Sequence, residues 1–406
     1  RDRLSRDQGL ETTDDEERNA GMAMKTTRGG LVAVLAAALI IVVLMSVVAA
    51  GCGGEGDLPS AGGSDNTAST AAPSTTAGSP DTTTARLAAA LNGAGATFPE
   101  PLYVEWIGEF QMANPKVTIN YQGIGSGGGI EQFTKLTVDF GASDAPMKDE
   151  EIAAAEAAGG AKVLHVPTVF GAVVLAYNLD GVDELRLDPD TLAGIFLGSV
   201  TAWNDAKIAA LNPDAVLPDL PIQVVHRSDS SGTTSIFTGY LAQVSASWEA
   251  QVGKGKEVEW PVGVGGQGND GVAAVVQQQA GSIGYVELSY ATESGLSMAT
   301  LQNQAGNFIT PSLESTSAAS VGVELPEDLR FSVSNSAGGQ AYPIVGATWI
   351  LVYGQMKDAA KVEALKAWLT WSLGEGTAVA EELGYAPLSE ELKALALEKI
   401  DSIGTF

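Results

Sequence analysis

Short β-rich segments alternate with amphipathic helical segments from Leu91 onward, and this alternation constrains the fold more than any other feature. Residues 117–121 alternate apolar and polar side chains, as a half-buried strand does, whereas Leu102, Trp106 and Phe110 recur at helical spacing. Further strands are expected at 163–166, 173–177, 222–226, 281–286 and 347–353, and further helices at 130–136, 192–197, 235–244, 362–373 and 389–400. This order indicates an α/β fold in which helices cover a sheet.

The N-terminal region has the pattern of a secretory signal. Lys25 and Arg28 precede an uncharged apolar run at 31–50, which ends in small residues directly before Cys52. We therefore expect residues 1–51 to be a signal region that is removed, and Cys52 to be lipidated as the new N-terminus. The alternative is an uncleaved transmembrane anchor, since about 20 apolar residues can span a bilayer. Both interpretations place the rest of the chain outside the cytoplasmic membrane.

Residues 52–87 are rich in Gly, Ser, Thr, Ala and Pro and contain few large apolar side chains. Such a segment cannot bury enough surface to offset its ordering entropy. We expect it to be a flexible tether between the lipidated cysteine and the globular region.

Composition excludes several classes of function. The net charge of −27 opposes binding to nucleic acid, so no nucleic-acid partner is expected. Cys52 is the only cysteine, which excludes an internal disulfide and cysteine-based metal sites. His165 and His226 are the only histidines, and we expect neither a metal nor a cofactor.

One glycine-rich loop, residues 123–129, lies between a predicted strand and a predicted helix, with Ser126 at the expected helix N-cap. Glycines let backbone N–H groups close on a ligand, and a helix start adds free donors and a positive dipole end. The spacing of Gly123, Gly125 and Gly128 also fits a dinucleotide fingerprint. Because such turns are common without any ligand, this loop alone does not decide the function.

A second loop, residues 226–234, also connects a predicted strand to a predicted helix. Arg227 could hold an oxyanion with two parallel N–H groups, and Ser231 and Thr233 add hydroxyl groups. The alternative is a capped helix beside a solvated arginine. Two such loops in one chain favour an anion site that is built from both.

A carboxylate, Asp144, lies in the third loop of this kind, residues 139–146. Its presence near an anion makes sense if the anion carries a proton, since the carboxylate can then accept a hydrogen bond. Sulfate has no such proton, and unpaired buried polar groups discriminate strongly. The alternative is that Asp144 closes a turn before Pro146.

The chain resembles the phosphate-binding proteins of phosphate-specific ABC importers (PstS type) over nearly all of 91–406. The resemblance depends on several motifs in the same order, at 93–99, 121–129, 138–146, 227–233, 263–271, 281–287 and 385–388. It implies a two-lobed periplasmic-binding-protein fold of type 2, with two hinge crossings and the ligand in the interlobe cleft. One lobe would combine 88–164 with 340–406, and the other would be 165–339.

The resemblance also implies the ligand contacts. Asp144 would accept the phosphate proton, and Asp229 would hold the guanidinium of Arg227 in place. The family often has glycine where Ser230 stands, so a positive φ there would cost strain. The second basic residue of the family's usual pair is His226 here, which leaves the charge at the cleft rim open. The phosphate contacts carried over by motif are Thr97, Phe98, Ser126, Asp144, Arg227, Ser231, Gly232 and Thr233.

The implied function is capture of inorganic phosphate by lobe closure and its delivery to the permease subunits of an ABC importer, by a monomer that is lipid-anchored to the cell membrane and catalyses no reaction. Sulfate or molybdate is the rival ligand, against which Asp144 and Arg227 argue. A tethered phosphate sensor or adhesin would keep the same fold. A secreted serine hydrolase or phosphatase would need Ser126 or Ser231 as nucleophile and His165 or His226 as base. Trp203 could be core or docking surface, and we expect it in the core.

Overall fold

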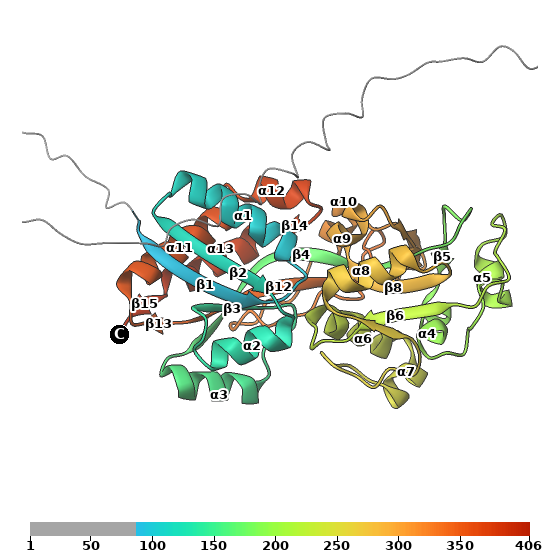
Figure 1. Ribbon diagram of the computed structural model, residues 1–406, viewed down its shortest axis with the longest axis horizontal. Coiled ribbons are helices and arrows are strands. Elements are labelled where there is room, and N and C mark those ends of the chain that lie inside the picture. The colour runs from blue at the N-terminus through green and yellow to red at the C-terminus, as the bar shows by residue number, and fades with distance from the viewer. Residues whose placement is uncertain (1–86) are drawn as a thin grey trace, which may run out of the picture. The chain divides into compact units, whose positions relative to one another are not determined.

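The computed structural model describes residues 87–406 (Figure 1). The predicted signal region, Cys52 and all but the last residue of the predicted tether lie outside these residues. From Leu91 onward the expected alternation of strands and helices is present, and most elements lie within a few residues of their predicted bounds.

A mixed sheet runs through the whole described region, in the order β2-β1-β3-β12-β4-β8-β6-β7, with β9 and β14 paired to β4. Parallel strands form each end of the sheet, and antiparallel pairs join the two ends in the middle. Two small sheets add β11-β10-β5 and β13-β15. The strands are β1 (Ala89–Gly95), β2 (Val117–Gly123), β3 (Phe140–Ser143), β4 (Val163–Tyr177), β5 (Arg186–Leu187), β6 (Gln223–Arg227), β7 (Val264–Gly266), β8 (Ser282–Glu287), β9 (Ser297–Met298), β10 (Thr300–Gln302), β11 (Phe308–Ile309), β12 (Val345–Tyr353), β13 (Gln355–Met356), β14 (Ala386–Pro387) and β15 (Gly404–Thr405).

Two lobes share this sheet, and we name them by their strands. The first lobe is built on β1, β2 and β3, and the second on β6, β7 and β8 (Figure 1). Helices α1, α2 and α11 pack on strands of the first lobe, and α6 and α8 pack on strands of the second. The helices are α1 (Glu100–Ala113), α2 (Ser126–Thr134), α3 (Asp149–Gly159), α4 (Pro189–Phe196), α5 (Ala206–Leu211), α6 (Gly232–Val244), α7 (Ala246–Gln251), α8 (Gly268–Gln278), α9 (Leu288–Glu293), α10 (Leu313–Ala319), α11 (Ala359–Leu373), α12 (Thr377–Glu382) and α13 (Glu390–Asp401).

Strands β4 and β12 carry the chain between the lobes. β4 pairs with β12 through residues 163–172 and with β8 through 173–177, while β12 also pairs with β3. Nearly every residue of both strands is buried, as expected for strands covered on both faces. Two crossings of this kind are what the two-lobed binding-protein fold requires.

The prediction of two separate strands at 163–166 and 173–177 was wrong, because β4 is continuous. Proline has no N–H group for a sheet ladder and normally interrupts a central strand. Here the pairing shifts at Pro167: Trp349 pairs with Pro167 and Thr348 with Val169, which leaves Thr168 as an extra residue in a β-bulge. The bulge lets the strand continue past the proline.

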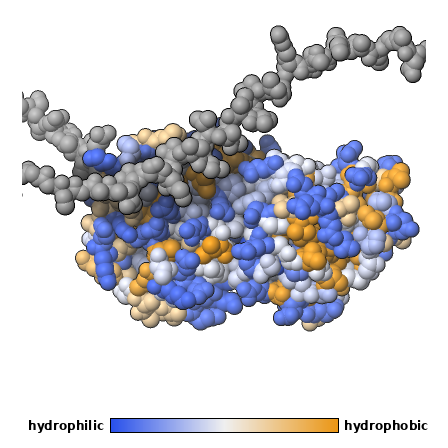
Figure 2. Space-filling model, viewed as in Figure 1, coloured by the Kyte–Doolittle hydropathy of each residue, from blue (hydrophilic) through white to orange (hydrophobic). Residues whose placement is uncertain are grey.

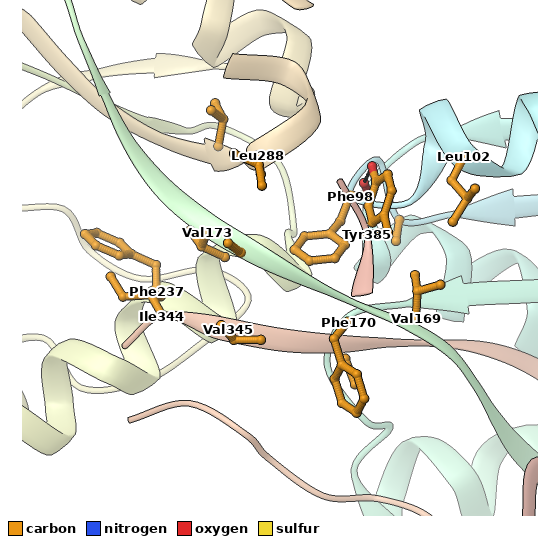
Figure 3. Close-up of a cluster of buried hydrophobic side chains, with 14 of the residues drawn as sticks. Phe98, Leu102, Val169, Phe170, Val173, Phe237, Leu288, Ile344, Val345 and Tyr385 are labelled. Carbon is orange, nitrogen blue, oxygen red and sulfur yellow. Dashed lines mark hydrogen bonds between the residues drawn. The ribbon is translucent and has the colours of Figure 1, made fainter. Parts of the chain in front are cut away.

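The hydrophobic core continues from one lobe into the other along β4 and β12. Figure 3 shows Phe98 beside Tyr385 on one side of β4, and Phe237 on the other side with Val345 of β12. Trp203 is fully buried and donates a hydrogen bond from its indole N–H to the carbonyl of Gly281 at 2.9 Å. The prediction that Trp203 belongs to the core is confirmed.

The visible face in Figure 2 is largely hydrophilic, with small scattered hydrophobic groups. Among residues 87–406, few large apolar side chains are exposed, and they include Met112, Val216 and Val321. Within residues 87–406, no helix has the length and apolarity needed to cross a bilayer.

Candidate functional site

The structure brings the predicted contact residues together between the lobes, where strand ends meet helix starts. Thr97 and Phe98 follow β1, Ser126 begins α2 and Asp144 follows β3. The second lobe contributes Arg227, the last residue of β6, and the following loop and first turn of α6 with Asp229, Ser231, Gly232 and Thr233. All of these except Asp229 are buried.

Thr97 and Phe98 make different contacts. The hydroxyl of Thr97 accepts hydrogen bonds from the side-chain and backbone N–H groups of Asn269, at 2.9 and 3.3 Å. The phenyl ring of Phe98 lies in the core against Tyr385, whose hydroxyl donates to the Phe98 carbonyl at 2.7 Å. Phe98 can therefore serve an anion only through its backbone N–H.

Ser126 connects the lobes directly. Its hydroxyl oxygen accepts hydrogen bonds from the backbone N–H groups of Asp144 in its own lobe and Gly232 in the other, both at 3.1 Å. The preceding Gly125 has φ of 83°, and a Cβ there would lie 2.4 Å from a carboxylate oxygen of Asp229. Glycine is therefore required for this close approach, and the α2 start lies against the second lobe.

Asp144 is a buried carboxyl group among donors. One oxygen, Oδ1, accepts a hydrogen bond from the Thr348 hydroxyl at 2.8 Å, and the other, Oδ2, accepts one from the Ser126 hydroxyl at 3.3 Å. Burial raises the pKa of Asp144 to about 7, although the hydrogen bond from Thr348 and the charge of Arg227 lower it. Asp144 can thus change its protonation state near neutral pH.

Arg227 is held by a two-pronged ion pair. Its Nε donates to Asp229 Oδ1 at 2.8 Å and its second terminal nitrogen to Asp229 Oδ2 at 2.5 Å. Its other terminal nitrogen donates to the Thr233 hydroxyl at 3.3 Å. Burial would raise the pKa of Asp229, but the hydrogen bonds and charge of Arg227 outweigh it and hold this pKa below its usual value. The guanidinium is therefore fixed in orientation as well as position.

The start of α6 supplies donors from the second lobe. Ser231 is the N-cap, and its hydroxyl oxygen accepts a hydrogen bond from the Thr234 N–H at 3.1 Å. Thr233 lies in the first turn, where N–H groups have no partner within the helix and the helix dipole is positive. The α2 start has the same kind of donors in the first lobe, and the two helix starts meet, since the Gly127 N–H donates to the Ser230 carbonyl at 2.9 Å.

Asn269 was not predicted as a site residue, yet it joins both halves of the site. Its side-chain N–H₂ group donates to the hydroxyls of Thr97 at 2.9 Å and Thr233 at 3.2 Å, and its carbonyl oxygen accepts from the Glu287 N–H at 3.0 Å. The only sequence signal for Asn269 was its place in the glycine-rich motif at 263–271, and that motif did not indicate a role for the side-chain amide.

Two expectations about the rim of the site are settled. Ser230 does not carry the strain considered for it, because the non-glycine residues of 87–406 with positive φ are Leu136, Leu329 and Asn335. His226 stacks on Trp260 with ring centroids 4.8 Å apart, and burial lowers its pKa. His226 therefore adds little positive charge at neutral pH, and Arg227 supplies the cationic group.

The residues of the hydrolase alternative are not assembled as a catalytic pair. His165 is buried and accepts a hydrogen bond from the Met147 N–H at 3.1 Å, and burial lowers its pKa to about 4. The His226 ring contacts the Arg227 carbonyl. Among the described residues, neither histidine hydrogen-bonds to Ser126 or Ser231, and no group of three or more His, Cys, Asp or Glu side chains could hold a metal ion.

Comparison with known proteins agrees with this geometry. A family model described as a PBP superfamily domain matches residues 69–375. The chain is 44% identical over 317 residues to the phosphate-binding protein PstS of Xylella fastidiosa, covering 77% of this chain and 85% of that protein. It is also 44% identical over 312 residues to the phosphate-binding protein PstS of Pasteurella multocida, covering 75% and 88%.

Solved structures show the same fold. A phosphate-binding protein from Stenotrophomonas maltophilia superposes with a TM-score of 0.59 at 21% identity, over 77% of this chain and 94% of that one. At this identity the likeness supports the two-lobed architecture, while the chemistry must come from the residues themselves.

Proposed function

Because this chain belongs to the PstS-type phosphate-binding proteins of the PBP superfamily, we propose that its interlobe site binds inorganic phosphate for an ABC importer. It is a binding protein and not an enzyme, since its relatives are named for binding, and neither His165 nor His226 hydrogen-bonds to Ser126 or Ser231. The contact residues we propose are Thr97, Phe98, Ser126, Asp144, Arg227, Ser231, Gly232 and Thr233, with Asp229 orienting Arg227.

One observation carries the choice of phosphate: a single buried carboxyl, Asp144, lies among hydroxyls, helix-start amides and a guanidinium. The donors suit any tetrahedral oxyanion. The carboxylate suits only an oxyanion with a proton to donate, since sulfate would place its oxygens against the carboxylate lone pairs. Hydrogen phosphate meets both conditions.

Lobe closure completes the site in this proposal. We place the first lobe at 88–164 and 340–406 and the second at 165–339, which is supported by the two crossing strands β4 and β12. Each lobe alone offers a few donors, whereas both together can replace the water shell of an anion. Contacts such as Ser126 to Gly232 are those that closure would form.

The location and partners follow from the same assignment. We propose that residues 1–51 direct export, that lipid on Cys52 anchors a monomer outside the cytoplasmic membrane, and that 52–87 tethers it. The tether would hold the lobes at high local concentration near the permease subunits. Mass spectrometry of the membrane-extracted protein would test the anchor by detecting diacylglycerol on Cys52.

Titration calorimetry with phosphate and sulfate tests the main proposal, using wild type, Asp144→Asn and the surface control Asp183→Asn. Wild type and control should bind phosphate and reject sulfate. Asp144→Asn should bind phosphate at least about 10-fold more weakly and lose much of its discrimination, because an amide N–H₂ group repels the phosphate proton but can donate to sulfate. Equal binding of both anions by wild type would refute the proposal.

A further inference from the structure

Three buried hydroxyl groups, those of Tyr103, Thr168 and Thr348, lie at the lobe crossing, and the Thr348 hydroxyl contacts Asp144. The Tyr103 hydroxyl lies 2.8 Å from the Thr168 hydroxyl, which donates to the Thr348 carbonyl at 3.4 Å. The Thr348 hydroxyl donates to Asp144 Oδ1 at 2.8 Å. Each of these side chains is at most 3% exposed, so water does not compete for these contacts.

The bulge at Pro167 places the two threonines at the lobe crossing. Thr168 is the extra residue of β4, and Thr348 of β12 is the last residue before the register shift. A bulge turns side chains away from regular alternation and often marks a functional position. The two crossing strands therefore each carry a buried threonine hydroxyl here, and that of Thr348 donates to the carboxyl of the site.

The two oxygens of Asp144 have different surroundings. Oδ1 accepts the hydrogen bond from the Thr348 hydroxyl, within the hinge region. Oδ2 faces Ser126 and the second lobe, since a Cβ built on Gly232 would lie 2.6 Å from it. Only Oδ2 is thus directed to the place where both lobes meet.

We propose that Thr348 is a positioning residue for anion specificity: its hydroxyl group holds Oδ1 as an acceptor, so that Oδ2 of an ionised Asp144 receives the hydrogen bond from the ligand's proton. This inference rests on the proposed function and adds to it the group that orients the selecting carboxylate. Thr348 itself does not contact the ligand.

The electrostatics of the site agree with this role. Burial raises the pKa of Asp144, and the Thr348 hydrogen bond is the largest influence that lowers it, ahead of the charge of Arg227. The other ionisable groups that face Asp144 are Asp229 from the second lobe, Tyr103 from α1 and Tyr121 from β2. Without the Thr348 hydroxyl, Asp144 would remain protonated to higher pH and would lose its capacity to accept.

The test compares Thr348→Ser, which keeps the hydroxyl, with Thr348→Ala, which removes it, alongside the isosteric Thr348→Val. Thr316→Val is the matched control, because Thr316 of α10 has a fully buried hydroxyl that donates to the carbonyl of the N-cap residue Ser312. Affinity for phosphate and sulfate is measured by calorimetry from pH 6.5 to 9.5, and circular dichroism checks that each variant is folded.

We expect Thr348→Ser and Thr316→Val to follow wild type. Thr348→Ala and Thr348→Val should bind phosphate about 10-fold more weakly near pH 7.5, with a deficit that shrinks toward pH 9.5, and should bind sulfate better relative to phosphate. A deficit that is constant with pH, or no deficit, would overturn the role of Thr348. Failure of wild type to bind phosphate would instead overturn the proposed function.

Discussion

The hydroxyl oxygen of Ser126 accepts a hydrogen bond from the backbone N–H of Gly232 at 3.1 Å, across 106 residues of sequence and from one lobe to the other. Gly232 makes this approach possible because it has no Cβ. A Cβ there would lie 2.5 Å from the Ser126 hydroxyl oxygen and 2.6 Å from Asp144 Oδ2, closer than real Cβ contacts. Contact between the lobes at this point therefore depends on a glycine.

Gly232→Ala should weaken phosphate binding by at least about 100-fold while leaving each lobe folded, because the methyl group holds the lobes apart and fills the site. Calorimetry gives the affinity, and thermal unfolding shows that the fold survives. Gly108→Ala is the matched control, since a Cβ at this α1 position meets nothing within 4 Å. Binding by Gly232→Ala within a few-fold of wild type would contradict the proposed closure.

Arg227→Lys should lower phosphate affinity by about 100-fold, because an ammonium group cannot replace the fixed two-pronged contacts that the guanidinium makes. Asp229→Asn should cost less, about 10-fold, since the guanidinium stays but is held less firmly. Arg186→Lys serves as control, because Arg186 lies over the Phe308 ring in the small sheet of β5, β10 and β11. Calorimetry at constant pH measures the phosphate affinity of all three variants. A larger loss of affinity for Asp229→Asn than for Arg227→Lys would contradict the orienting role of Asp229.

Much of the site could be predicted from the sequence because its parts are local. A strand end, a glycine-rich or serine-rich turn and a helix start each occupy a few consecutive residues, and each supplies its own donors. The loops that carry Ser126, Asp144 and Arg227 were recognisable for that reason, and the structure places all three in one site.

The contacts between distant segments could not be predicted in the same way. Asn269 joins Thr97 to Thr233, and Thr348 holds Asp144, through side chains whose neighbours are set by packing and not by spacing. The prediction of separate strands at 163–166 and 173–177 was wrong for a similar reason, since β12 pairs on both sides of the bulge and keeps β4 continuous. The β-propensity of a segment predicts its strand boundaries poorly where pairing with neighbouring strands determines them.

An ion pair between the lobes lies next to the loop of residues 226–234. The Lys256 ammonium group contacts Glu151 of α3 at 2.6 Å, and the Lys256 carbonyl accepts a hydrogen bond from the Ser231 N–H at 2.9 Å. Both charged side chains are at least three-quarters buried, which makes the pair stronger than an exposed one. It should hold the lobes together once phosphate has bound.

Lys256→Met should speed phosphate release about 5-fold, because it removes the ion pair but keeps the carbonyl that holds Ser231. Stopped-flow displacement, followed by intrinsic tryptophan fluorescence, measures the rate. Lys135→Met is the control, since Lys135 forms an exposed ion pair with Glu131, one turn earlier on the same lobe. The effect should diminish in high salt. Equal release rates for wild type and Lys256→Met would show that the pair does not hold the lobes together.

Glu287 is a fully buried carboxyl behind the site. Oε2 accepts a hydrogen bond from the Ser289 N–H at 2.8 Å, whereas Oε1 has no partner among the described residues. Burial raises the pKa of Glu287 to about 8, against the effect of the Ser289 hydrogen bonds. The folded protein therefore keeps a proton on Glu287 that the unfolded chain releases at much lower pH.

Linkage gives this proton a definite effect on stability. Between the ordinary glutamate pKa and about 8, the folded state binds more protons than the unfolded state, so stability falls as pH rises through this window.

Glu287→Gln, which resembles the protonated acid, removes this dependence of stability on pH. It should be more stable than wild type at pH 8.5, by on the order of 2 kcal/mol, and nearly equal at pH 4.5. Urea unfolding at both pH values measures the difference, with exposed Glu293→Gln as control. A gain for Glu287→Gln that is the same at both pH values would show that the benefit comes from packing and not from the proton.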